Sequence, residues 1–219
     1  MNPSSNPSVF IDITPNLHYD MGDLIRARIR ASLARLHATP GEIHPGDTVA
    51  IKINLTIPAP PELAVTTHPL LLRAIILELQ SLGATITVVE DCEPEAVSVS
   101  GTAAVLAETG VSFINLRERD FQPVASNPTI YSYATDILNT THLISIPKLK
   151  THLYTYYTGA IKNMFGCIPK SERRELHREM ATPRFSEHLV NIYAFKRPTL
   201  VILDGILAME GIGPTQGIP

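Results

Sequence analysis

Three consecutive stretches decide the fold: DTVAIKINL (47–55), HPLLLRAIILELQSLG (68–83) and ATITVVED (84–91). The first and third are short runs rich in β-branched apolar residues, as in strands buried on both faces. The middle stretch has the apolar spacing of a helix, with Pro69 in its first turn and Gly83 at its end. A strand, a helix and a strand in this order predict a βαβ unit with parallel strands.

The same alternation continues on both sides of this unit. Strands are predicted over 9–13, 111–116, 142–147 and 198–205, and helices over 21–36, 101–110, 154–165, 171–180 and 184–195. The Pro-containing stretch 117–141 indicates a lid or a small β-hairpin. Residues 1–219 are therefore predicted to form a single α/β domain, with a mostly parallel sheet covered by helices on both faces. Residues 1–8 are expected to be a flexible tail, and the Gly- and Pro-rich EGIGPTQGIP (210–219) suggests a C-terminally truncated domain.

The composition restricts the class of protein. Hydrophobic residues make up 44% of the 219 residues and charged residues 18%, as in a globular domain with a packed core. A net charge of −3 gives no reason to expect nucleic acid or an anionic membrane as a partner. No apolar run has the length of a membrane span, and the first residues lack the features of a secretory signal. Two cysteines, Cys92 and Cys167, without a CxxC pair give no disulfide or metal framework, so a cytoplasmic protein is expected.

Positive charge is concentrated in one part of the chain. Between residues 148 and 178, seven Lys and Arg residues occur with only two Glu residues, a local charge of +5 against −8 for the rest. Such a local field attracts an anionic ligand. A solvated helix face is the alternative, and it suits SERRELHRE (171–179), which combines helix formers with mixed charge. It suits Lys148 and Lys150 less well.

Polar side chains follow the predicted strands at their carboxyl ends, which meet at one edge of a parallel sheet and bind ligands there. The predicted ligand-binding residues are Lys52, Asn54, Thr67, Asp91, Lys148, Lys150, Asn163, Asp204, Glu210, Gly211 and Gly213. Each has a simpler explanation on its own, such as a helix cap for Thr67 or strand-ending turns for Asp91 and Asp204. Their coincidence at one sheet edge predicts a site for an anionic small molecule.

Four residues are candidates for catalysis: His68, His152, Lys162 and His177. Histidines exchange protons near neutral pH and bind metals. A lysine that is partly desolvated or close to other cations has a lowered pKa, which suits covalent chemistry. The alternatives are a capping role for His68 and an exposed helix position for Lys162, whose stem would cover apolar surface. The residues alone name no cofactor or metal.

Several motifs recur in one known family: KINL (52–55), TTHP (66–69), PKLKTH (147–152), GAIKNMFG (159–166), His177 and DGILAMEGIGPTQG (204–217). Together they resemble the domain-of-unknown-function family 362 over nearly the whole chain. The resemblance implies an association with an iron–sulfur ferredoxin module. Because this sequence has no CxxCxxC array, an iron–sulfur cluster is expected only in a longer form or in a ferredoxin-type partner. A non-catalytic partner of an electron-transfer protein is therefore an alternative function.

A more remote resemblance is to the nickel-pincer lactate racemases. It rests on the order His152, Gly159, Lys162, Gly166 and His177. This resemblance implies a racemase- or epimerase-like enzyme in which Lys162 anchors a cofactor, His177 binds a metal and other histidines move the proton. Asn54 and Ile57 stand where those enzymes have an aspartate and a substrate-clamping arginine. The resemblance therefore implies a shared fold more than a shared cofactor.

Overall fold

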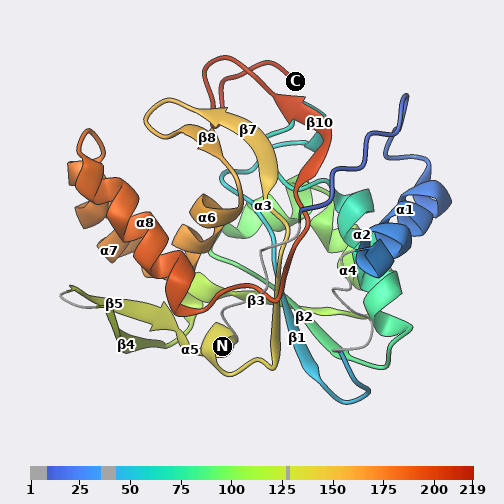
Figure 1. The fold of residues 1–219 in the computed structure, drawn as a ribbon, viewed down its shortest axis with the longest axis horizontal. Helices are drawn as coiled ribbons and strands as arrows, with labels where there is room; N and C mark the ends of the chain where they lie inside the picture. The colour runs from blue at the N-terminus through green and yellow to red at the C-terminus, as the bar shows by residue number, and fades with distance from the viewer. Residues whose placement is uncertain (1–8, 36–42, 127–128) are drawn as a thin grey trace.

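A computed structural model describes residues 9–35, 43–126 and 129–219, so the tail predicted at residues 1–8 lies outside the described residues. Its centre is a five-stranded sheet in the order β3-β2-β1-β6-β9, in which every neighbouring pair is parallel (Figure 1). The strands are β1 (Thr48–Lys52), β2 (Thr85–Glu90), β3 (Ser112–Asn115), β6 (His142–Ser145) and β9 (Leu200–Val201). The prediction of an α/β fold with a mostly parallel sheet is confirmed.

Helices cover both faces of this sheet (Figure 1). One face carries α1 (Gly22–Arg35), α2 (Pro69–Gln80), α3 (Pro94–Val99) and α4 (Thr102–Thr109). The other carries α5 (Thr135–Leu138), the short helix η3 (Met164–Cys167), α8 (Pro183–Phe195) and a hairpin of β4 (Phe121–Ser126) and β5 (Thr129–Ala134). This hairpin confirms one of the two alternatives for 117–141.

Side chains of the central strands alternate between two cores. In β1, Ile51 belongs to the core under α1 and α2, whereas its neighbour Ala50 belongs to the core under η3 and α8. Ile144 and Leu143 of β6 divide in the same way. Each fully buried Leu or Ile side chain contributes about 1.5–3 kcal/mol, so burial on both faces stabilises the sheet. This double burial explains why the strands read as continuous apolar runs.

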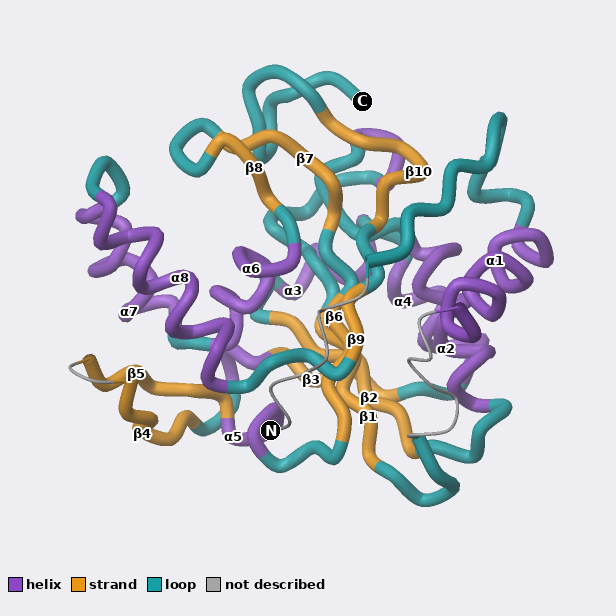
Figure 2. Tube along the Cα trace, in the orientation of Figure 1, coloured by secondary structure: helices purple, strands orange, loops and turns teal. Residues whose placement is uncertain are grey.

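A second, smaller sheet rises from the carboxyl ends of the central strands (Figure 1). It contains β10 (Asp204–Met209), β7 (Lys148–His152) and β8 (Tyr156–Thr158). β7 is parallel to β10 and antiparallel to β8. The loop after β10 runs beside the β7–β8 hairpin (Figure 2), where Leu153 N donates to Gly213 O at 3.1 Å. The lysines of β7 therefore lie above the sheet edge that the sequence indicated.

After this hairpin in the sequence, the chain forms three short helices. They are α6 (Ala160–Asn163), α7 (Lys170–Leu176) and η4 (His177–Glu179). Two further turns of this kind are η1 (Pro61–Leu63), in the loop after β1, and η2 (Leu116–Glu118). The segment from β7 to η4 thus changes direction several times within about thirty residues, which brings its cations close to one another.

Three predicted elements are wrong. The stretch 9–13 forms no strand, because it pairs with no other strand in the described ranges, and Val9, Ile11 and Ile13 are exposed. The helix predicted over 154–165 is a β-turn and strand followed by α6 and η3, because Tyr and Thr favour strands and Tyr156 turns the chain with a φ of 59°. The strand predicted over 198–205 divides into β9 and β10, which belong to different sheets.

Candidate functional site

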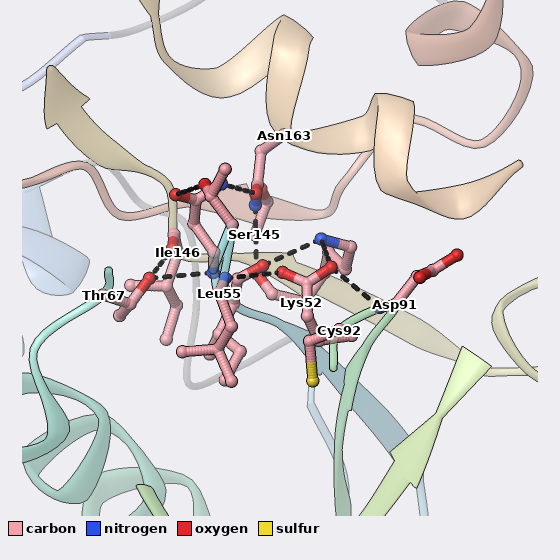
Figure 3. A network of polar contacts seen from close by, with 12 residues as sticks. Lys52, Leu55, Thr67, Asp91, Cys92, Ser145, Ile146 and Asn163 are labelled. Carbon is pink, nitrogen blue, oxygen red and sulfur yellow. Dashed lines mark hydrogen bonds and ion pairs between the residues drawn. The ribbon is translucent and has the colours of Figure 1, made fainter. Parts of the chain in front are cut away.

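The carboxyl edge of the central sheet is closed by a buried ion pair (Figure 3). Lys52 ends β1 and Glu90 ends β2, so the parallel strands bring Lys52 Nζ to 2.8 Å from Glu90 Oε1. Both side chains are almost fully buried. Glu90 also accepts from the backbone N–H groups of Leu55 at 2.9 Å and Asp91 at 2.8 Å, and Lys52 donates to Ile53 O at 2.8 Å. These bonds satisfy both charges within the protein, as a buried pair requires.

Amide and hydroxyl groups extend this network (Figure 3). Asn163 Nδ2 donates to Ser145 Oγ at 2.9 Å and to Lys52 O at 3.2 Å, and Asn163 Oδ1 accepts from Asn54 Nδ2 at 3.3 Å. Thr67 Oγ1 donates to the carbonyl oxygen of residue 146 at 2.7 Å and accepts from Asn54 N at 2.9 Å. The predicted ligand-binding residues of this network are thus bonded to one another. They form the floor of the site.

A second buried cluster joins β7, β10 and the stretch before α1. Lys148 Nζ lies 3.0 Å from Asp204 Oδ2 and 2.8 Å from Tyr19 Oη, and Tyr19 donates to Asp204 Oδ1 at 2.7 Å. Burial holds the pKa of Lys148 below its usual value, although the Asp204 carboxylate opposes this shift. Sequence reasoning missed Tyr19, since a single tyrosine in NLHYD (16–20) carries no signal.

His68 belongs to this second cluster. Its backbone N–H donates to Asp204 Oδ2 at 2.9 Å, and its ring stacks on Tyr19 with a centroid distance of 3.4 Å. Nδ1 accepts from Leu70 N at 3.3 Å, which makes His68, rather than Thr67, the N-cap of α2. Burial lowers the pKa of His68 to about 4. The structure therefore gives His68 the capping role and separates it from the other candidate histidines.

Asp91 anchors α7 to the end of β2. Its carboxylate, whose side chain is 1% exposed, pairs with Arg173 and, at 3.0 Å, with Arg117 Nε. Arg117 also lies 2.7 Å from Glu93, which pairs at 3.2 Å with Lys170. Asp91 is thus occupied by two arginines. Arg173, which the sequence placed on a solvated helix face, is instead a partly buried structural cation.

More than half of the cations in residues 148–178 pair with carboxylates, and three of these carboxylates come from elsewhere in the fold. Four of the seven cations form ion pairs: Lys148 with Asp204, Lys170 with Glu93, Arg173 with Asp91, and Arg178 with Glu175. Three have no carboxylate partner among the described residues: Lys150, Lys162 and Arg174. Arg174 is exposed, where water solvates its charge. The two lysines are not, so they are the cations that a ligand could neutralise.

Lys150 is 1% exposed and projects from β7 beneath the loop that follows β1. Its ammonium donates to Thr56 Oγ1 at 2.7 Å and to Val65 O at 2.6 Å. Burial, followed by the charge of Lys162, lowers the pKa of Lys150 to about 7. Neutral oxygens thus hold this group, and it lies close enough to Lys162 for the two charges to repel each other.

Lys162 lies on α6 and is partly buried. Its Nζ is 5.9 Å from the centre of the Phe165 ring, and it makes no hydrogen bond or ion pair with any residue that the structure describes. Burial, followed by the charge of Arg173, lowers the pKa of Lys162 to about 8. A desolvated ammonium that lacks an anion is costly, so an anion bound at Lys162 would stabilise the protein.

His152, at the end of β7, is a neutral ring at pH 7. Its Nδ1 accepts from Tyr154 N at 3.2 Å and from Thr155 N at 3.3 Å, which assigns the proton of the neutral ring to Nε2. Burial, followed by the charge of Lys162, lowers the pKa of His152 to about 4. Burial and Lys162 also lower the pKa of His177, in the same order. The charge of Lys162 thus lowers the pKa of both rings.

A pocket of about 460 Å³ opens between His152 and His177. Its walls are the β7–β8 turn, the end of η4 and the C-terminal loop, with lining residues His152, Leu153, Tyr154, His177, Met180 and 212–216. Gly213 packs directly on Thr151 of β7, which brings the C-terminal loop against the hairpin. A smaller cavity of about 250 Å³, between α1, α2 and β9, brings together none of the predicted residues.

The predicted residues thus divide by place. His152, His177 and Gly213 line the pocket, whereas Lys150 and Lys162 do not line it but lower the pKa of His152. The two buried networks hold Lys52, Asn54, Thr67, Asn163, His68, Lys148 and Asp204, and Asp91 pairs with Arg117 and Arg173. Glu210 and Gly211 are exposed, and the backbone of Glu210 pairs with Ile218. Within the described ranges, no three His, Cys, Asp or Glu side chains are grouped so that they could hold a metal ion. No helix in that part of the chain is long and apolar enough to cross a membrane.

Comparisons with known proteins agree with the motifs in the sequence. "Thylakoid-associated protein sll1697" of Synechocystis sp. is 30% identical over 213 residues, which cover 92% of this chain and 64% of that protein. The chain therefore spans less than two thirds of the length of this curated relative. Residues 49–219, which run from the second residue of β1 to the end of the chain, match the family described as "Domain of unknown function (DUF362)". The resemblance seen in the motifs is confirmed, and the chain belongs to the DUF362 family.

Proposed function

We propose that this domain binds an anionic small molecule in the pocket between the β7–β8 turn, η4 and the C-terminal loop. The observation that carries the proposal is the ammonium of Lys162, which is partly buried and has no carboxylate partner in the described part of the chain. Lys148, Lys170 and Arg173 of the same region do have such partners. A bound anion would give Lys162 the countercharge that the fold gives to its neighbours.

The neutral ring of His152 supports the same proposal. Since its Nδ1 accepts two backbone N–H groups, the ring presents an N–H donor at Nε2. A donor of this kind suits the oxygen of a carboxylate or phosphate. The description of the Synechocystis relative as thylakoid-associated names a location rather than a ligand. The chemistry of the pocket is therefore the basis for the proposal.

Thermal unfolding in the presence of anions tests this function. We expect inorganic phosphate, pyruvate or lactate to raise the melting temperature of the wild-type protein at matched ionic strength. A ligand at a hundred times its dissociation constant stabilises a fold by about 2.7 kcal/mol. The variant Lys162→Met should lose most of this anion-dependent shift. Lys170→Met is the matched control, because Lys170 is already paired with Glu93 and needs no bound anion.

Two results would contradict the proposal. One is a wild-type protein that none of these anions stabilises beyond the effect of sodium chloride. The other is a Lys162→Met variant that keeps the full shift, because the countercharge to Lys162 would then contribute nothing to binding. A Lys170→Met variant that loses the shift as well would indicate nonspecific screening by salt rather than a site.

A further inference from the structure

We propose that the cavity between α1, α2, β6 and β9 is a second binding site, which holds the hydrocarbon chain of a carboxylic acid. The chain lies among aliphatic side chains, and its carboxylate pairs with Arg30 where the cavity opens to solvent. This inference goes beyond the proposed function, because it concerns a different cavity and a different class of ligand. The observations behind it are the volume and lining of the cavity and an excess of positive charge at its opening.

The cavity has a volume of about 250 Å³ and a largely aliphatic lining. Seven of its ten lining residues are Ile or Leu, so hydrocarbon is the main surface that a ligand would meet. Ile75 and Leu79 of α2 and Ile144 of β6 are at most 3% exposed and belong to the core of the domain. An apolar cavity of about 150 Å³ stays free of water and binds benzene. A larger cavity of the same character suits an alkyl chain.

Two arginines share one glutamate at the opening of this cavity. Glu78, whose side chain is 8% exposed, accepts from Arg26 Nε at 2.9 Å and from Arg30 Nε and Nη2 at 3.0 and 2.9 Å. Two positive charges and one negative charge leave a net charge of +1. Glu78 is the only acid that lines the cavity within the described ranges. The opening therefore attracts an anion.

Arg30 is placed to bind that anion. It lines the cavity, and its side chain is 65% exposed, so it lies where the apolar wall meets solvent. Its Nε and Nη2 are used by Glu78, whereas its Nη1 donates to no residue that the structure describes. A guanidinium group with free N–H donors binds a carboxylate by charge-assisted hydrogen bonds. Arg30 thus supplies a polar end to a cavity that is otherwise apolar.

The combination selects a carboxylate with a hydrocarbon chain among small molecules. A sugar phosphate would leave its hydroxyl groups without hydrogen bonds against the aliphatic lining, which is costly. An amine would be repelled by the net charge of the two arginines and the glutamate. A fatty alcohol would fill the cavity but would bring no charge to Arg30. A carboxylate at the end of an alkyl chain matches both parts of the cavity.

Isothermal titration calorimetry with octanoate, hexanoate and 1-octanol at pH 7 and matched ionic strength tests the ligand class. Octanoate should bind, and the dissociation constant should rise about fourfold for each methylene group removed in hexanoate. 1-Octanol should bind about two- to fivefold more weakly than octanoate, because the carboxylate interacts with a largely exposed arginine.

The variant Arg30→Gln should remove the advantage of octanoate over 1-octanol. Glu78 keeps its ion pair with Arg26 in this variant, so the buried carboxylate is not left without a countercharge. Arg28→Gln is the matched control, because it makes the same change of charge on α1 at an exposed position that does not line the cavity. This control should bind both ligands as the wild type does.

NMR spectra of the wild-type protein with labelled isoleucine methyl groups locate the bound chain. Octanoate should shift the signals of Ile29, Ile75, Ile144 and Ile202, which line this cavity. It should leave the signal of Ile212 unchanged, because Ile212 lines the pocket of the proposed function. Phosphate should shift Ile212 instead, so the two proposals can fail separately. This measurement does not depend on how well a variant folds.

Three results would overturn the inference. In the first, neither octanoate nor 1-octanol binds, and the cavity then takes no hydrocarbon chain. In the second, octanoate shifts Ile212 but not the four isoleucines of the cavity, so it binds in the other pocket. In the third, octanoate and 1-octanol bind equally and Arg30→Gln changes neither, which would leave an apolar cavity without a preference for carboxylates.

Discussion

At the scale of single residues, the position of Gly166 leaves no room for a side chain. It lies in η3, directly on the buried pair of Lys52 and Glu90. A Cβ atom at this position would be 3.0 Å from Lys52 Nζ and 3.1 Å from Glu90 Oε1. Both neighbours are fixed by other hydrogen bonds, so they have little freedom to move away. The glycine therefore allows η3 to close over the charged floor of the site.

We expect Gly166→Ala to destabilise the protein by roughly 1–3 kcal/mol, as overpacking a fixed interior does. The matched control is Gly22→Ala at the start of α1, where a Cβ would meet nothing within 4 Å. That change should be neutral or stabilising by up to about 1 kcal/mol, since alanine favours helices over glycine. Urea unfolding of both variants measures the difference. Equal stabilities for the two variants would show that η3 can move off the ion pair at no cost.

The lowered pKa of His68 predicts how the stability of the protein depends on pH. Its pKa is about 4 in the folded protein, and about 6.5 is expected in the unfolded chain. Between these values the unfolded chain binds a proton that the folded protein does not, so stability should fall as the pH drops from 6.5 to 4. Burial is the main cause, and among the charges that act on His68, Asp204 and Glu62 oppose it while Lys148 adds to it.

The size of this loss is on the order of 2 kcal/mol, and the variant His68→Asn isolates it, because asparagine can still cap α2. The variant should be less stable at pH 7, where it lacks the stacking of His68 on Tyr19. Its stability should nevertheless fall less steeply than that of the wild type between pH 6.5 and 4. The free energy of unfolding is measured with urea at each pH for both proteins. If the two pH profiles are parallel, His68 is not the group that causes the loss of stability.

At the scale of elements, the sequence correctly predicted the helices and strands that local residue patterns determine. It failed where contacts with distant parts of the chain determine the structure. The βαβ unit of β1, α2 and β2 was predictable because apolar period, Pro69 and Gly83 all agree. The run of Tyr and Thr at 154–158 suits a strand as well as a helix, and its pairing with β7 decides between them. The cations of the site were visible in the sequence. Their carboxylate partners were not, because Asp91 and Asp204 come from distant elements.

A prediction at this scale concerns the contact between the C-terminal loop and β7. A Cβ on Gly213 would overlap the carbonyl oxygen of Thr151, so Gly213→Ala should push the loop away from the hairpin. We expect a loss of roughly 1–3 kcal/mol in stability and a wider pocket. Limited proteolysis should then cleave residues 210–218 faster than in the wild type, and Gly22→Ala should leave that rate unchanged. Unchanged cleavage in Gly213→Ala would mean that the loop and β7 are not held together by this close contact.

At the scale of the whole molecule, the cluster of Tyr19, His68, Lys148 and Asp204 fastens the two sheets together. Tyr19 and Asp204 are 185 positions apart in the sequence, yet their side chains share a hydrogen bond of 2.7 Å. Tyr19 precedes α1, and His68 caps α2, which packs against the central sheet. Lys148 lies on β7 and Asp204 on β10, both in the smaller sheet. No local pattern could reveal this cluster, because each residue becomes informative only beside the others. The pocket depends on it, since β7 carries Lys150 and His152.

Asp204→Asn should therefore destabilise the whole protein, because it leaves the ammonium of Lys148 buried without a countercharge. The expected loss is about 3–5 kcal/mol, as for other buried pairs that lose one partner. Adding Lys148→Met should restore at least about 1 kcal/mol, because methionine removes the buried charge while the introduced asparagine still accepts a hydrogen bond. Urea unfolding of both single variants and the double variant completes the cycle. If Lys148→Met costs as much in the Asp204→Asn background as it does beside Asp204, the two charges do not act as a pair, and the sheets are joined by packing alone.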